Sequence, residues 1–161
     1  MFHDFAPGIE YREQTPAQGR GKWRFHLQRT IITKLHFSHP DCTFHDATGK
    51  EWARIEMNVL TIRSGYEWNG CSPKITLGPL WLGTPDFPGT RKASLVHDVL
   101  FQFSPTKHFR ASFWQCNEQF RRHMLRHDFL LCELYFHAVQ KFGKTYFKQP
   151  DPNVHSKPLL P

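Results

Sequence analysis

The first half of the chain alternates apolar and polar residues in short runs that are separated by turn residues. Runs of this kind, rich in β-branched and aromatic residues, are typical of half-buried β-strands. They cover residues 22–27, 30–33, 42–46, 51–55 and 57–62. Ala47-Thr48-Gly49-Lys50 joins two of the runs, which predicts a hairpin with glycine in its turn. We therefore expect a mostly antiparallel sheet of about four or five strands.

The second half changes to the helical period, with apolar residues recurring every three or four positions. Three predicted helices cover residues 90–103, 109–126 and 128–142. In the third, Asp128 is expected as the N-cap and Gly143 as the C′ residue. Its inner face is expected to carry Leu131, Leu134, Tyr135, Ala138 and Phe142. Strands first and helices last predict an α+β fold, with an N-terminal antiparallel β-sheet and three C-terminal α-helices.

Proline and glycine divide the chain into three parts. We expect an irregular N-terminal arm over residues 1–21, a single α+β domain over 22–143 and a Pro-rich C-terminal tail over 144–161. The connection between sheet and helices, residues 65–88, is rich in glycine and proline and is expected to lack regular structure. A loop of that length is usually functional or packed against something.

Composition limits the classes of partner. The chain has 161 residues, 15% aromatic residues and a formal charge of +7, which suits one compact basic domain. No run of lysine and arginine exceeds two residues. Basic residues do alternate with Trp23 and Phe25, but this pattern is also typical of a half-exposed strand. Nucleic acid is therefore disfavoured as a binding partner. No signal peptide and no apolar stretch near the roughly 20 residues of a membrane span is visible.

Two predicted helices each carry one polar residue on their apolar stripe. They are His97, among apolar positions 93, 96, 100 and 103, and Asn117, among positions 113, 120 and 124. An unpaired buried polar group costs roughly 1–3 kcal/mol, so each needs a partner. We expect the two side chains to face each other, with the amide oxygen accepting an imidazole N–H. Such a pair either only specifies helix packing or takes part in chemistry.

Other candidate sites have weaker support. A zinc peptidase helix would need Glu between His123 and His127, where Met124 stands, so we expect surface or interface histidines there. A second group could ligate zinc but fits no tight template. Its members are His36, His39, Asp41, Cys42 and His45. The four cysteines (Cys42, Cys71, Cys116 and Cys132) lack CxxC spacing and read as reduced thiols. Neither Ser72 nor Ser94 has the context of a serine nucleophile.

The order of several segments resembles a family of small phage and prophage proteins that has no known function. The segments are GYEWNGCSPK (65–74), SLVHDVLFQF (94–103), RASFWQCNEQF (110–120) and a helix with Tyr135, Ala138, Val139, Phe142 and Gly143. The resemblance covers about residues 57–143. It implies a phage or prophage product that is made in the host cytoplasm, with the virion as a further location.

The same pattern is similar to that of secreted phospholipase A2, in which a Gly-rich loop and an Asp hold Ca²⁺, the preceding His activates water and a second Asp orients that His. By this similarity His97 would be the catalytic base, Asn117 its orienting residue and Asp98 a metal ligand. Carbonyls of Tyr66, Trp68 and Gly70 would complete a Ca²⁺ site. Gly65, Asn69, Cys71, Ser72 and Pro73 would shape the loop.

The chain departs from both patterns at two asparagines. The loop carries Asn69 where the phage family has Asp, and the second helix carries Asn117 where an Asp would orient the histidine. An amide can accept a hydrogen bond but cannot stabilise an imidazolium as a carboxylate does; in serine proteases the equivalent change lowers kcat about 10⁴-fold. A calcium site with one carboxylate would also be weak.

These departures favour a phage-encoded binding or structural module, virion- or tail-associated, on a hydrolase-like scaffold. The alternative is a Ca²⁺-assisted hydrolase that acts on a host envelope lipid or amide. A third interpretation is a binder of anionic ligands that uses the positive charge. The expected partners are other virion proteins or the host envelope, and self-association into a homo-oligomer stays open.

Overall fold

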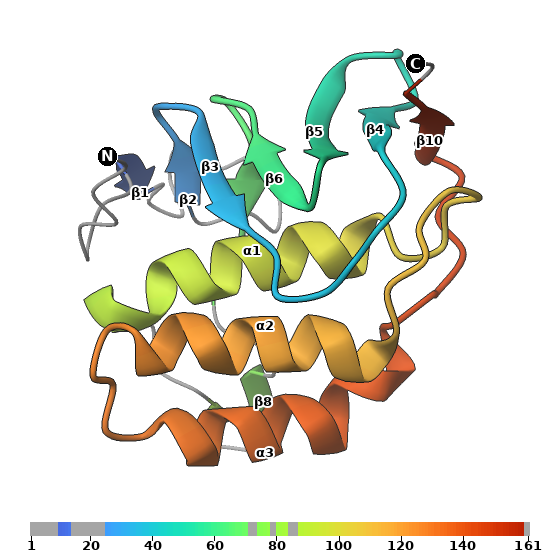
Figure 1. Cartoon of the computed structure of the whole chain (residues 1–161). Coiled ribbons are helices and arrows are strands. Elements are labelled where there is room, and N and C mark those ends of the chain that lie inside the picture. Colours follow the sequence, from blue (N-terminus) through green and yellow to red (C-terminus); the bar gives the residue numbers. More distant parts are fainter. Residues whose placement is uncertain (1–9, 14–24, 71–73, 78–79, 84–86, 160–161) are drawn as a thin grey trace.

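The computed structural model describes residues 10–13, 25–70, 74–77, 80–83 and 87–159. The strands of the larger sheet form one layer and the helices lie beneath it, with α3 on the side farthest from the sheet (Figure 1). The strands come first along the chain, apart from one C-terminal strand, and the three α-helices follow them. The fold is therefore of the α+β class, as the order of sequence patterns predicted.

The larger sheet has five antiparallel strands in the order β10-β4-β5-β6-β3. Their bounds are Ile31–Lys34 (β3), Cys42–Asp46 (β4), Glu51–Glu56 (β5), Val59–Ile62 (β6) and Val154–Pro158 (β10). The sequence analysis began one strand at Met57, but Met57 and Asn58 have φ of 49° and 61° and form the β5–β6 turn. Strand β10 comes from the predicted tail and pairs with β4 along its whole length.

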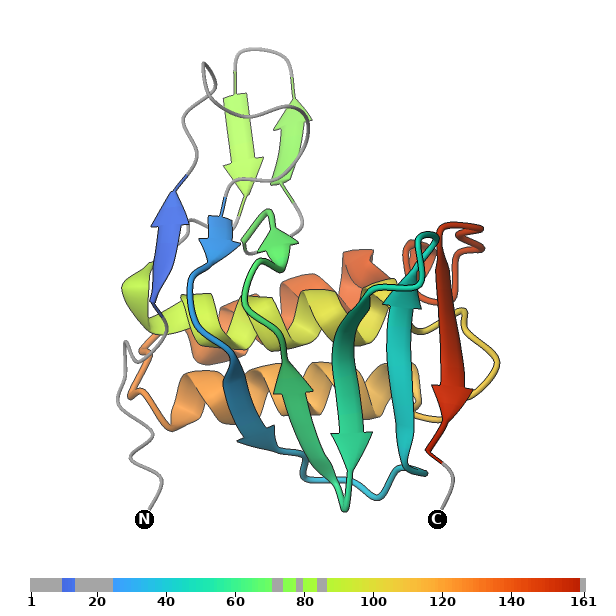
Figure 2. The ribbon, with the colours of Figure 1, turned by 90° about the horizontal axis from the view of Figure 1, so that it is seen from above.

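A smaller sheet has the order β1-β2-β7, and β8 pairs with β9 in a separate hairpin. Their bounds are Tyr11–Glu13 (β1), Phe25–Leu27 (β2), Glu67–Trp68 (β7), Lys74–Leu77 (β8) and Leu80–Gly83 (β9). Three of these strands lie within 65–88, so the prediction of a connection without regular structure is wrong. The hairpin extends away from the sheet and the helices (Figure 2).

The helices are α1 (Arg91–Gln102), α2 (Phe113–Leu125) and α3 (Cys132–Phe142), with 3₁₀ turns η1 at Pro88–Thr90 and η2 at Gly143–Thr145. Helix α2 begins later than predicted because Ser112 caps it, in a capping box with Gln115. Asp128 is not the N-cap of α3, since it has φ of 49° and lies in the preceding turn. Gly143 is not left-handed either; its φ is −73° and the chain continues into η2.

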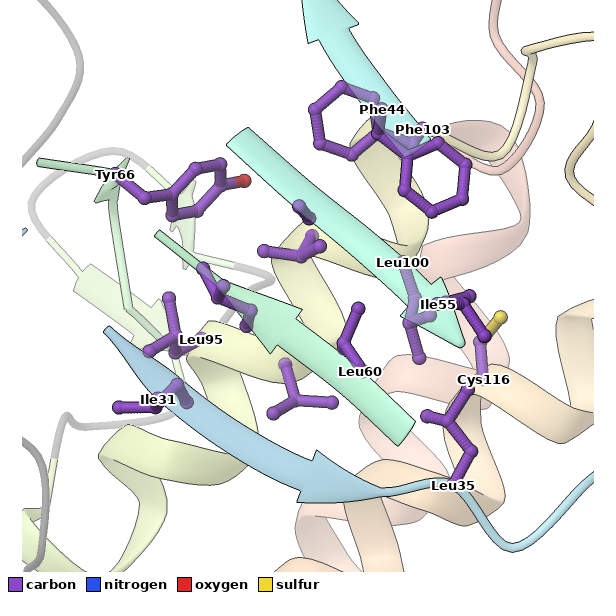
Figure 3. Packing of buried hydrophobic residues seen from close by; sticks show 14 of the residues in the cluster. Ile31, Leu35, Phe44, Ile55, Leu60, Tyr66, Leu95, Leu100, Phe103 and Cys116 are labelled. Atoms are coloured by element: carbon purple, nitrogen blue, oxygen red, sulfur yellow. The ribbon is translucent and has the colours of Figure 1, made fainter. Parts of the chain in front are cut away.

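The main core lies between the larger sheet and α1. Side chains from both layers interdigitate there, including Ile55 and Leu60 from the sheet and Leu95 and Leu100 from α1 (Figure 3). Phe44 stacks on Phe103 with ring centroids 5.0 Å apart. Removing this apolar surface from water stabilises the fold by roughly 25 cal/mol per Å².

A second apolar cluster joins α2 to α3. It contains Ala93, Phe120, Met124, Cys132, Tyr135 and Val139. The prediction of the inner face of α3 is correct for Tyr135 but wrong for Leu131, Leu134 and Phe142, which are exposed. The helix is rotated relative to the prediction, so that Cys132, Tyr135, Phe136 and Val139 are buried. An apolar stripe therefore remains on the outer surface. No helix in the described residues is long and apolar enough to cross a bilayer.

Candidate functional site

His97 of α1 and Asn117 of α2 face each other, as their positions on the two apolar stripes predicted. The imidazole Nε2 lies 2.8 Å from the Asn117 Oδ1 atom, and both side chains are buried. Because Oδ1 can only accept, the Nε2–H of His97 donates this hydrogen bond. The contact fixes one tautomer of the imidazole and ties α1 to α2.

The rest of the His97 environment is aromatic. The imidazole packs against Phe101 and Phe120, with ring centroids 4.0 Å and 5.0 Å away. Burial lowers the pKa of His97 from 6.5 to about 4, an effect that the hydrogen bond to Asn117 only partly opposes. The side chain is therefore neutral at pH 7. A general base works best with a pKa near the operating pH, so His97 is a weak one.

Asn117 offers His97 no charge compensation. Its Nδ2 atom is buried and has no hydrogen-bond partner within the described residues. The amide oxygen accepts the imidazole N–H but carries no negative charge, so an imidazolium would be buried opposite a neutral group. The pair thus has the chemistry of a helix-packing contact more than that of an acid–base pair.

Asp98 belongs to a different face of α1. Together with Ser94 and Gln102 it forms a polar stripe at i, i+4 and i+8 spacing, next to the segment that contains β7. The Trp68 indole N–H donates to the Ser94 hydroxyl at 3.2 Å, and the Tyr66 hydroxyl donates to the Gln102 amide oxygen. Asp98 lies between these two contacts along the helix.

The negative charge of Asp98 affects the pKa of the Tyr66 phenol. Burial raises the pKa of the Tyr66 phenol well above its usual range, and the negative charge of Asp98 raises it further. The sequence analysis did not identify Ser94 and Gln102 as partners of this segment. The signal that could have found them is their spacing of four residues on either side of Asp98.

The segment before β7 is shaped by a glycine. Gly65 has φ of +88°, a left-handed conformation that favours glycine, whereas an added Cβ would lie 3.4 Å from the Trp52 ring, which is an ordinary contact distance. Its amide donates to the Leu27 carbonyl, and the Leu27 amide donates to the Tyr66 carbonyl at 2.9 Å. Gly65 and Tyr66 together thus oppose one residue of β2, which is a β-bulge.

The residues that were predicted to hold calcium already have other contacts. Ca²⁺ takes about six to eight oxygen ligands. The carbonyl of Tyr66 already accepts a backbone hydrogen bond from β2, Trp68 is paired with Phe25 in the small sheet, and Asp98 supplies a single carboxylate. Gly70 is buried with φ of +82°. Cys71, Ser72 and Pro73 lie outside the described residues.

The five residues that were considered for zinc bond mostly to other groups, although the Cys42 Sγ atom lies 3.9 Å from Nδ1 of His39. His39 uses both ring nitrogens: Nδ1–H donates to the Pro40 carbonyl and Nε2 accepts the Arg110 amide. The His36 amide and ring both bind Gln119, Asp41 accepts the Met57 amide, and His45 bonds Thr43 and Gly49. Burial raises the pKa of the Cys42 thiol to about 12. The described residues contain no group of three or more His, Cys, Asp or Glu side chains that could hold a metal ion.

A buried polar network between β3 and α2 was missed by the sequence analysis. The Gln119 side chain accepts from the His36 amide at 2.9 Å and donates to the Lys34 carbonyl at 3.2 Å. Its Nε2 also lies 2.9 Å from Nε2 of His123, which contacts the Thr33 hydroxyl at 3.3 Å. His123 is thus buried and structural, which corrects its prediction as a surface or interface histidine.

Comparison of the chain with protein-family models, with curated proteins and with solved structures finds no match. The chemistry of the site therefore has to be inferred from its own geometry. It combines a neutral, amide-bound histidine with a carboxylate on another face of the same helix.

Proposed function

We propose that the chain is a phage-encoded binding or structural module, associated with the virion or its tail, that retains a hydrolase-like scaffold without using it for catalysis. The phage origin rests on the resemblance of residues 57–143 to a phage and prophage family. The binding role rests on the geometry around His97 and on the surface of α3.

The observation that carries the proposal is the state of His97. A water-activating histidine needs a partner that stabilises the imidazolium and a pKa near that of its task. His97 instead donates to the neutral amide of Asn117, and burial lowers its pKa to about 4. Replacing the carboxylate of the phospholipase pattern by an amide suits a residue that holds two helices together.

The surface favours docking over catalysis. Four leucines between positions 125 and 134 and the aromatic residues Phe142 and Tyr146 are exposed on or beside α3. Strand β10 is an edge strand of the larger sheet, so one of its sides is not paired within the described residues. Exposed apolar side chains and unpaired strand edges are the usual contact elements of assembly proteins.

Particle composition tests the virion assignment. Particles from a producing culture are purified on a density gradient and analysed by mass spectrometry. The proposal expects the chain to co-purify with particles at a constant copy number. Absence from the particles, together with a monomeric purified chain that joins no partner, would overturn it.

A turnover assay tests the other half of the proposal. The purified chain is incubated with fluorescent phospholipids and with acyl amides, in millimolar Ca²⁺ and in EDTA. We expect no turnover above the blank by the wild type or by His97→Gln. Ca²⁺-dependent hydrolysis by the wild type that a folded His97→Gln variant loses would establish the hydrolase alternative instead.

A further inference from the structure

Helix α3 has two apolar faces, of which the fold covers only one. Cys132, Tyr135, Phe136 and Val139 are buried against the neighbouring helices. Leu131, Leu134, Ala138 and Phe142 follow each other at helical spacing along a second side, which we call the outer stripe. Within it Leu134 is 63% exposed, Leu131 44% and Phe142 38%. The helix that carries this stripe is the one farthest from the larger sheet (Figure 1).

The stripe continues into the turn before α3. Leu130 is 97% exposed, more than any other large apolar residue in the described chain, and Leu125 at the end of α2 is 46% exposed. Polar residues commonly occupy turns of this kind, whereas this one reads Asp-Phe-Leu-Leu. A leucine side chain that contacts so little of its own protein is available to insert into an apolar medium such as the acyl chains of a lipid.

Positive charge borders the stripe. Residues 126–148 include four lysine or arginine residues and two acidic ones. Lys141 follows Leu134 by two helical turns, and its Nζ lies 5.5 Å from the Phe142 ring centroid. Lys144, just after α3, and Arg126, the C-cap residue of α2, are exposed. Of the acidic residues, Glu133 is paired with Arg121, at 2.6 Å.

We propose that the outer stripe of α3 docks on an anionic lipid bilayer. Leu130, Leu131, Leu134 and Phe142 enter the boundary between headgroups and acyl chains, while Lys141 and Lys144 stay at the depth of the phosphates. Interfacial helices combine these same features, an apolar side and lysines or arginines beside it. The exposed ring of Tyr146 adds an aromatic residue with a polar tip, which is typical of the bilayer interface.

Charge favours this occupant over a second copy of the chain. Two copies that meet through the same stripe bring Arg126, Lys141 and Lys144 of both copies together, and each chain carries a formal charge of +7. Like charges oppose such a contact, whereas anionic headgroups are attracted to it. The inference rests on the proposed binding role and names the chemistry of its partner.

Vesicle co-sedimentation of the full chain tests the proposal. The probes are vesicles of phosphatidylglycerol and phosphatidylcholine, and vesicles of phosphatidylcholine alone. The test variant is Leu130→Ser combined with Leu134→Ser. The matched control is Met57→Ser, because Met57 is also strongly exposed but lies in the β5–β6 turn. Circular dichroism checks that each variant is folded.

We expect the wild type and Met57→Ser to bind the anionic vesicles with equal affinity. The affinity of the double variant should be lower by a factor of about ten or more. Removing the anionic lipid or raising the salt concentration should weaken wild-type binding by a similar factor. Equal binding by the double variant, or no wild-type binding at low salt, would overturn the proposal. A wild-type dimer that the double variant converts into monomers would assign the stripe to self-association instead.

The outcomes separate this inference from the proposed function. A chain that co-purifies with particles but does not bind anionic vesicles contradicts the lipid inference alone. A chain that binds the vesicles through Leu130 and Leu134 but is absent from particles contradicts the virion assignment alone.

Discussion

The Nε2 atom of His97 lies 2.8 Å from the amide oxygen of Asn117, and this contact joins α1 to α2 inside the protein. A neutral donor meets a neutral acceptor, so the pair can be buried without the desolvation of a charge. A carboxylate at position 117 would favour the imidazolium instead. The choice of asparagine thus decides whether the histidine serves packing or proton transfer.

The free energy of unfolding should fall on acidification, because His97 is protonated more readily in the unfolded chain. Its pKa is 6.5 in the unfolded chain and about 4 in the folded one, so between these values the unfolded state binds more protons. The contribution is fully present above pH 6.5 and is lost as the pH falls toward 4. It amounts to about 3 kcal/mol, from ~1.4 kcal/mol for each pH unit between the two pKa values.

Urea unfolding between pH 7.5 and pH 4 measures this contribution as a difference between the wild type and His97→Gln. We expect the free energy of unfolding of the wild type to fall more steeply with acidification than that of the variant. Parallel curves would mean that His97 is not held neutral by the fold.

Asn117→Ala should destabilise the protein by about 2–4 kcal/mol, because the His97 N–H loses its acceptor and a cavity opens between two helices. Chemical denaturation measures the change. Asn153→Ala is the matched control, since Asn153 is exposed in the turn before β10 and should cost less than about 1 kcal/mol. A similar cost for both variants would argue against a special role for the buried pair.

The sequence predicted the class of fold and the His97–Asn117 contact because both depend on local periodicity. Five strands and three helices are visible in the sequence as alternation or helical spacing. The two polar residues on apolar stripes each need a hydrogen-bond partner, which makes their contact predictable. Contacts that depend on the tertiary arrangement were not predictable in this way. Four of the five residues of strand β10 are polar or turn-forming, and the strand acquires its conformation from pairing with β4. In the sequence Gln119 resembles any polar helix residue, and only the position of β3 gives its side chain a buried hydrogen-bond partner.

The rotation of α3 shows a different limit. Apolar residues occur on both sides of this helix, so periodicity alone allows either Leu134 or Val139 to face inward. The position of α2 and the cluster around Phe120 select the side with Val139. The surroundings of the candidate calcium ligands were unpredictable for a similar reason, because the hydrogen bond from Leu27 to the Tyr66 carbonyl depends on where β2 lies.

Two alanine variants test the rotation of α3. Leu134→Ala should change the free energy of unfolding by less than about 0.5 kcal/mol, because the side chain is already exposed. Val139→Ala should lower it by about 2 kcal/mol, because a buried side chain is truncated. Calorimetry compares the two, and the reverse order would restore the face that the sequence analysis expected.

Truncation tests whether the tail belongs to the fold. A chain that ends at Gly143 loses β10, the contact of Phe147 and Val154 with the core and the hydrogen bond from Lys148 to Ser104. We expect a loss of about 3 kcal/mol or more, and aggregation through the exposed edge of β4. A chain that ends at Leu159 is the control and should melt like the full chain. Equal melting of the shorter chain would make 144–161 a separate tail.

The most direct test of the central claim is an NMR titration of the His97 ring nitrogens, in the wild type and in Asn117→Asp. We predict that wild-type His97 stays neutral, with the proton on Nε2, until the pH approaches about 4, and that the aspartate raises its pKa. A wild-type pKa between 6 and 7, near the ordinary value of ~6.5, would contradict the account. His97 would then be poised for proton transfer, and the chain would have to be examined as an enzyme.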